Sequence, residues 1–175
     1  MAAAFERSLP TQAEFHEAIS SRSGRWFSAC LRITRDAALA EDAVQEALLH
    51  AWQKRHQFQG DARLDTWIHR IAINAALTIV RRRRPGIFEP LDDDIADSGN
   101  SPEGELAKRD LGDGLTTALR DLTGLEQICF VLKHLEQWRL KEIAAELDTT
   151  VSVVKQALFR GVKKLRVTMA DMQSR

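Results

Sequence analysis

The chain has 175 residues, of which 44% are hydrophobic and 29% charged, so it is long enough for one ordinary domain or two small ones. Its 25 basic and 25 acidic residues balance, which excludes a uniformly basic or acidic protein. The distribution is uneven: residues 85–105 carry 7 acidic and no basic side chains, whereas 1–84 carry 13 basic and 9 acidic and 106–175 carry 12 basic and 9 acidic. Two mildly basic segments therefore flank an acidic one.

Apolar residues recur at helical spacing along nearly the whole chain, and no alternating run is long enough for a sheet. We therefore expect an all-α protein. The start resembles no export signal, and no apolar run approaches the ~18 residues of a membrane span. Cys30 and Cys129 lie far apart among apolar neighbours, which argues against a disulfide or a metal cluster. These features favour a protein of the reducing cytoplasm.

The first basic segment predicts a bundle of helices. Thr11 and Glu14 form a capping-box pattern, and helices should follow to about residue 35 with a soft break at 20–24. Another helix should cover about 40–55, with Glu41, Asp42, Gln45 and Glu46 on its outer face. The core residues expected in these helices are Phe15, Ile19, Trp26, Cys30, Ile33, Val44, Leu48 and Trp52.

After a loop over residues 56–63, Asp65 or Thr66 should cap a further helix that ends in four arginines, 81–84, and is stopped by Pro85. Its core stripe should consist of Ile68, Ile71, Ala72, Ala75 and Ile79, leaving His69, Arg70, Ile73 and Asn74 on the other side.

Residues 85–105 contain three of the four prolines, three glycines and the seven acids, so we expect a flexible linker with no packed core. A weak helix over about 101–122 should follow. A second capping box at Thr123 and Glu126 should begin a helix that runs to about residue 134.

Two helical stripes joined by a polar turn at 148–150 then predict a helix-turn-helix. Its second helix should place Val151, Val154, Leu158 and Leu165 in the core and a polar, basic stripe outside. Residues 152–166 contain five basic residues and no acid, which suits a helix that enters the major groove of DNA.

The order and spacing of these features resemble the extracytoplasmic-function (ECF) group of bacterial RNA polymerase sigma factors over about 150 residues. The motifs that carry the resemblance are Glu41 to Glu46 with Trp52, Phe58 to Asp61, Thr66 to Asn74 with the arginine run, Glu142 to Leu147, and Val154 to Arg160. The resemblance implies a two-domain initiation factor with no catalysis of its own: sigma region 2 at 1–84, an acidic linker at 85–105 and sigma region 4 at 106–175.

The resemblance also implies three sets of contact residues. Asp42, Gln45 and Glu46 would dock on the β′ coiled coil of core RNA polymerase, while the C-terminal domain would seat on the β flap and the linker would enter the nucleic-acid channel. The residues implied at the minus-ten element are Phe58, Gly60, Asp61, Arg63, Trp67, Arg70, Asn74, Arg81 and Arg82. The residues implied at the minus-thirty-five element are Ser152, Lys155, Gln156, Phe159, Arg160, Lys163 and Lys164.

Promoter DNA, core polymerase and an anti-sigma factor, which can be membrane-anchored, are the partners implied. We expect no cofactor, small-molecule substrate or metal, because the five histidines have no ligand spacing. The chain departs from the family pattern at Thr123-Gly124, where a Pro is usual, at Arg139, where a Ser caps, and at Asp148, where the turn has Gly. It also has Gln156-Ala157 in place of a Ser-Arg pair, which removes a cation from the reading helix.

Other interpretations remain open on the residues alone. The outer face of the 40–55 helix can be merely solvated, the arginine run can complement a helix C-terminus, Trp67 can be a packing residue and Asn74 a surface amide. A stand-alone helix-turn-helix repressor would bind a palindrome as a dimer, but the sequence suggests no dimerisation helix. A nuclease would need clustered carboxylates, and the only cluster, Asp92 to Asp94, lies in the linker. The sigma factor is our prediction.

Overall fold

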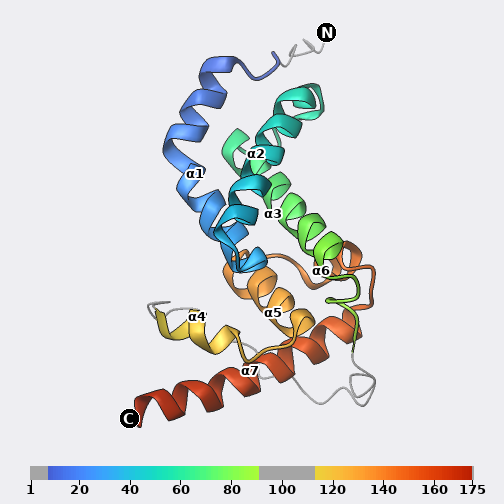
Figure 1. Ribbon diagram of the computed structural model, residues 1–175. Coiled ribbons are helices and arrows are strands. Elements are labelled where there is room, and N and C mark those ends of the chain that lie inside the picture. The colour runs from blue at the N-terminus through green and yellow to red at the C-terminus, as the bar shows by residue number, and fades with distance from the viewer. Residues whose placement is uncertain (1–7, 91–112, 175) are drawn as a thin grey trace. The chain divides into compact units, whose positions relative to one another are not determined.

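In a computed structural model that describes residues 8–90 and 113–174, every regular element is a helix (Figure 1). The chain divides into two compact units, which join between Arg83 and Arg84. The expected all-α fold with two helical domains is confirmed. Residues 91–112, which include most of the expected linker and the start of the 101–122 helix, lie outside the described residues.

Three helices that pack against one another form the N-terminal unit: α1 (Gln12–Thr34), α2 (Ala37–Gln53) and α3 (Leu64–Arg83). The predicted capping box begins α1, since the Thr11 N–H donates to Glu14 Oε2 at 2.6 Å and the Glu14 N–H donates to Thr11 Oγ1 at 3.2 Å. These hydrogen bonds lower the pKa of Glu14. Asp36 caps α2 through the Leu39 N–H at 3.0 Å.

The soft break expected at residues 20–24 is absent, because α1 is continuous there. The Ser21 hydroxyl donates to the carbonyl of Glu17 at 2.8 Å, so this polar side chain is satisfied within the helix. Buried residues on either side of the segment, Ala18 and Trp26, hold both halves of α1 against the bundle. Tertiary packing therefore outweighs the weak helix propensity of Ser and Gly.

The buried face of α2 consists of four alanines, Ala40, Ala43, Ala47 and Ala51. The prediction of Val44, Leu48 and Trp52 as its core is wrong, because Val44 and Leu48 are half-buried and Trp52 is 37% exposed. Trp52 instead covers the edge of the bundle. Its ring centroid lies 5.1 Å from that of Phe15, and Cζ of Arg55 lies over the ring, 4.2 Å from its centroid. Small residues on the inner face allow α2 to approach its neighbours closely.

Helix α3 begins at Leu64, so Asp65 and Thr66 lie in its first turn instead of capping it. Its buried side is wider than one stripe, because α3 packs against both α1 and α2. Ile73, predicted on the outside, is fully buried, and Ile71 and Ala75 are only half-buried. The buried residues of α3 are Ile68, Ala72, Ile73, Ala76, Leu77, Ile79 and Val80.

The C-terminal unit contains α4 (Asp113–Leu119), α5 (Gly124–Phe130), a π-helical turn η4 (Val131–Leu135), α6 (Leu140–Glu146) and α7 (Val151–Gln173). Helix α7 contacts α4, α5 and α6 and is the spine of the unit. It continues beyond the basic 152–166 segment to Gln173. Where α4 meets α5 and α7, one core cluster comprises Leu115, Ala118, Leu119, Leu122, Phe130, Val162 and Leu165.

Local hydrogen bonds compensate for the departures of this sequence from the family pattern. Arg139 has no side-chain acceptor, yet its N–H donates to the Glu142 carboxylate at 2.8 Å, so half of a capping box begins α6. Asp148 adopts the left-handed conformation, with φ 52°, which Asp tolerates and the turn requires. The Thr150 hydroxyl then caps α7 by accepting the Val153 N–H at 3.2 Å.

Residues 84–90 belong to the C-terminal unit, although they directly follow α3. Two turn hydrogen bonds shape them, from the Ile87 N–H to the carbonyl of Arg84 and from the Glu89 N–H to that of Gly86, both at 3.1 Å. Phe88 is buried. A Cβ added at Gly124 would collide with Cγ1 and the carbonyl oxygen of Ile87, so glycine is required where this segment crosses the start of α5.

We expect Gly124→Ala to destabilise the C-terminal unit by about 1–2 kcal/mol, because the collision outweighs the gain of up to ~1 kcal/mol in helix propensity. Gly24→Ala is the matched control, since a Cβ there meets nothing within 4 Å, and it should stabilise α1 by up to ~1 kcal/mol. Urea unfolding measures both changes, and hydrogen exchange at Ile87 and Glu89 reports release of the segment. Equal stabilisation by both substitutions would contradict the close contact.

Candidate functional site

The outer face of α2 presents the first group of predicted residues. Asp42, Gln45 and Glu46 are all exposed, opposite the alanine face that packs in the bundle. Leu49 lies one turn further along the same face and is 59% exposed. Sequence reasoning missed Leu49, although an apolar residue in line with a polar stripe was a visible signal. Together these four residues form a continuous surface that another protein can contact, with an acidic and an apolar part.

The loop before α3 folds back on the helix that follows it. A short 3₁₀ turn, η1 (Arg55–Gln57), leads into the loop. The ring centroids of Phe58 and Trp67 lie 5.3 Å apart, and the angle between the ring planes is 50°. Both rings are half-buried, so Trp67 has a packing role in the free protein. Gly60, with φ 73°, and Asp61 are exposed at the bend.

At the end of this loop, an acid joins two arginines from different elements. Asp65 Oδ1 lies 3.1 Å from Nε of Arg63, and Asp65 Oδ2 lies 3.2 Å from Nε of Arg22 on α1. The contact links the loop to α1 across the first turn of α3. It leaves the Arg63 side chain 77% exposed.

Along α3, Trp67, Arg70, Asn74 and Arg81 share one face by helical spacing. Arg70 and Asn74 are half-buried, and Arg82 beside Arg81 is exposed. Asn74 Oδ1 is shielded from solvent and accepts no hydrogen bond within the described structure. The structure thus brings these residues together on a surface that begins at the loop and runs down α3.

The predicted stripe on α7 faces away from the core of the C-terminal unit. Ser152, Lys155, Phe159 and Lys163 are exposed, while Gln156 and Arg160 are half-buried at its edge. The opposite side is buried, as predicted for Val154, Leu158 and Leu165, whereas Val151 is half-buried. Ala157 is buried as well, so this position does not reach the exposed stripe.

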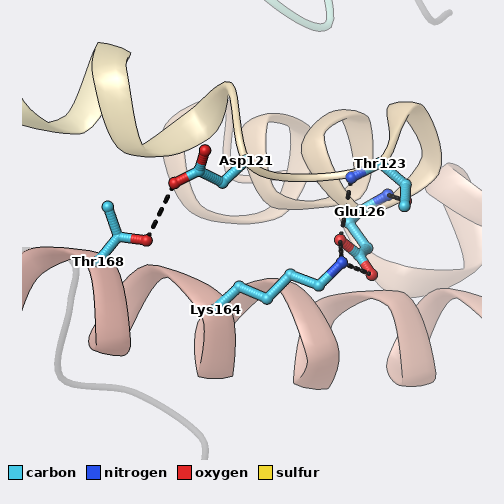
Figure 2. Close-up of polar contacts among 5 residues, drawn as sticks. All are labelled: Asp121, Thr123, Glu126, Lys164 and Thr168. Carbon is cyan, nitrogen blue, oxygen red and sulfur yellow. Dashed lines mark hydrogen bonds and ion pairs between the residues drawn. The ribbon is translucent and has the colours of Figure 1, made fainter.

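Lys164 differs from the rest of its predicted group, because its ammonium contacts α5 (Figure 2). Its Nζ lies 2.8 Å from Oε2 and 3.0 Å from Oε1 of Glu126, whose side chain is 5% exposed. Glu126 Oε2 also accepts the Thr123 N–H at 3.0 Å. One turn beyond, the Thr168 hydroxyl donates to Asp121 Oδ2 at 3.1 Å. These bonds hold α7 against the start of α5 and against the turn before it. A DNA contact by Lys164 stays a prediction.

The described residues contain no group of three or more His, Cys, Asp or Glu side chains placed to hold a metal. Burial raises the pKa of the Cys129 thiol to about 12, so this thiol is protonated at neutral pH. Burial, with Lys133 beside it, lowers the pKa of His134. Over the same parts of the chain, none of the helices is long and apolar enough to span a membrane.

Comparison with protein families assigns both units. The family model "Sigma-70 region 2" matches residues 19–85, and "Sigma-70, region 4" matches residues 113–165. A two-domain helical protein with these regions in this order defines a class, the bacterial sigma factors of RNA polymerase. Within that class, the chain belongs to the extracytoplasmic-function group.

Several curated relatives illustrate this membership. SigG of Mycobacterium tuberculosis is 30% identical over 170 residues, which cover 83% of this chain and 46% of SigG, so the chain spans about half the length of that relative. SigW of Bacillus subtilis is 25% identical, with 92% and 91% covered. RNA polymerase sigma-H factor of Pseudomonas aeruginosa is 30% identical, with 75% and 73% covered.

Among solved structures, the sigma factor RpoE of Bartonella quintana, crystallised with the anti-sigma factor NepR, has a similar fold. Its TM-score is 0.60 at 17% identity, and the match covers 90% of this chain and 97% of RpoE.

Proposed function

We propose that this protein binds core RNA polymerase and directs it to specific promoters, without catalytic activity of its own. The observation that carries the proposal is the presence of regions 2 and 4 in one chain, in this order, each with its predicted contact residues exposed or half-buried. A factor that acts on polymerase and chromosome works in the bacterial cytoplasm. It needs no cofactor or small-molecule substrate.

The outer face of α2 is the proposed docking surface for the β′ coiled coil of the polymerase. Asp42, Gln45 and Glu46 supply charge and hydrogen bonds, and Leu49 adds an apolar contact at the end of the same stripe. The C-terminal unit would seat on the β flap. The acidic segment within 85–105 would enter the nucleic-acid channel, where carboxylates stand in for phosphates.

The face that runs from the loop down α3 is the proposed minus-ten surface. Phe58, Gly60, Asp61 and Arg63 lie in or beside the loop, and Trp67, Arg70, Asn74, Arg81 and Arg82 follow on α3. Promoter opening exposes bases that a protein can capture. Asn74 is half-buried on this face and its amide suits hydrogen bonding to a base edge, while the arginines bind phosphates.

The exposed stripe of α7 is the proposed reading surface for the minus-thirty-five element in the major groove. Ser152, Lys155, Gln156, Phe159, Arg160 and Lys163 provide donors, positive charge and an aromatic ring for bases and phosphates. Anti-sigma factors act by covering such surfaces, and the similarity to RpoE crystallised with NepR supports an anti-sigma partner here.

We expect the triple substitution of alanine for Lys155, Gln156 and Arg160 to weaken initiation at least ~10-fold without unfolding the C-terminal unit, because a lost base contact costs about 1–3 kcal/mol. Transcription from a template with an intact upstream element measures the loss. A template with a scrambled upstream element is the control, since wild type and variant should be equally weak on it. An unchanged preference for the intact element in the variant would refute the assignment of this stripe.

Run-off transcription with core polymerase, with and without the protein, on a pool of genomic promoter fragments tests the proposed function itself. Discrete new transcripts are the expected result, and their start sites define the promoter elements. A protein that fails to bind core polymerase but binds duplex DNA tightly as a dimer would instead be a stand-alone repressor.

A further inference from the structure

The carboxylate of Asp65 is an unexpected group on a surface proposed to bind DNA. Its side chain is only 15% exposed, and each of its oxygens pairs with a different arginine, Oδ1 with Arg63 and Oδ2 with Arg22. An isolated carboxylate would repel phosphates, but here two guanidinium groups surround it and the three side chains carry one net positive charge. Asp65 therefore adds no negative potential to the surface and must be explained in another way.

One explanation is purely local. Asp65 lies in the first turn of α3, where the helix dipole favours an acid, and its contact with Arg22 ties α3 to α1. Neither effect requires Arg63. The contact with Arg63 is separate: the Arg63 Nε donates to Oδ1 at 3.1 Å, within the three-residue span that leads from the loop into α3.

The atom that Asp65 holds determines what Arg63 can do. A guanidinium carries five N–H donors, of which Nε has one and the two terminal nitrogens have four. Asp65 binds the Nε, so its hydrogen bond leaves the terminal nitrogens to a ligand, on a side chain that is 77% exposed. Those two nitrogens can bind a phosphate or a base edge end-on in bidentate fashion.

We propose that Asp65 is a positioning residue that holds the Arg63 guanidinium in place for contact with the minus-ten strand. An exposed arginine without this anchor samples many rotamers, and that freedom is lost when it binds DNA. Asp65 removes part of that loss in advance and also orients the terminal nitrogens. Arg22 neutralises the second oxygen and fixes the carboxylate from α1. This inference rests on the proposed function.

A double-mutant cycle on the holoenzyme tests the inference, with affinity for a forked DNA whose minus-ten strand is already single-stranded as the readout. Asp65→Ala should raise the Kd about 3–10-fold, and Arg63→Ala should raise it at least as much. The variant that carries both substitutions should be no weaker than Arg63→Ala alone, because Asp65 acts through Arg63. Arg22→Ala should lower the thermal unfolding temperature and raise the Kd by less than Asp65→Ala does, because Arg63 keeps its own contact with Oδ1.

Equal losses from Asp65→Ala with and without Arg63 would overturn the inference, because Asp65 would then act on the fold. Tighter binding by Asp65→Ala would also overturn it, since the carboxylate would only be repelling DNA. Asp65→Asn serves if Asp65→Ala unfolds, because the amide keeps the shape and one acceptor; its loss should likewise vanish in the Arg63→Ala background. Wild-type protein that forms no holoenzyme refutes the proposed function instead, so the two failures are distinguishable.

Discussion

Substituting arginine for both Asp42 and Glu46 should abolish association with core RNA polymerase. Both side chains are exposed on α2, opposite the alanines that hold the helix in the bundle, so the substitutions should leave the fold intact. Reversing two charges at a complementary interface places like charges opposite each other, which costs several kcal/mol. We therefore expect affinity to fall at least ~100-fold, as measured by co-purification and by titration of labelled core enzyme.

A matched control separates docking from general electrostatics. Glu17→Arg with Asp171→Arg changes the net charge by the same amount at exposed positions on α1 and α7 that are not part of the docking face. This control should bind core polymerase as the wild type does. Equal losses from the two double variants would show that charge alone matters, and unchanged binding by the first would show that the α2 face is merely solvated.

Lys163 and Lys164 are adjacent in sequence, but alanine should affect stability at one position and DNA recognition at the other. Lys164→Ala leaves the Glu126 carboxylate buried without its cation, and we expect the C-terminal unit to lose about 1–3 kcal/mol, less than for a fully buried pair because the Lys164 side chain is 44% exposed. Lys163→Ala removes an exposed lysine, so stability should change by less than ~0.5 kcal/mol while minus-thirty-five recognition weakens.

Urea unfolding and promoter binding, measured on both variants, separate these roles. Glu126→Gln combined with Lys164→Ala should recover part of the lost stability, because an amide needs no cation and can still accept the Thr123 N–H. Indistinguishable stabilities of the Lys163→Ala and Lys164→Ala variants would contradict the structural role of Lys164.

Sequence patterns located several helix starts, because these depend on neighbouring residues. The capping boxes at Thr11 and Thr123 and the left-handed turn at Asp148 each involve groups within a few residues of one another. The buried side of a helix was predicted less well. Ile73 and Trp52 were assigned to the wrong side, since burial depends on how many neighbours a helix has and how near they come.

In the candidate sites, too, features set by local periodicity were predicted and features set by long-range contacts were not. The sequence predicted which residue types gather on the outer faces of α2, α3 and α7, because helical periodicity alone determines which side chains share a face. It could not predict which lysine on α7 is engaged elsewhere. Lys164 and Glu126 are 38 residues apart, and only the packing of α7 on α5 brings them within 2.8 Å.

By itself, the sequence determined the all-α class, the two-domain plan and the family, since local propensity, periodicity and motif order are properties of the chain. Only the tertiary structure decided that α2 packs through alanines, that position 124 must be glycine because Ile87 lies against it, and that Asp65 pairs with both Arg22 and Arg63. These features depend on contacts between segments distant in sequence. Such contacts arise from close packing in three dimensions, which no local pattern encodes.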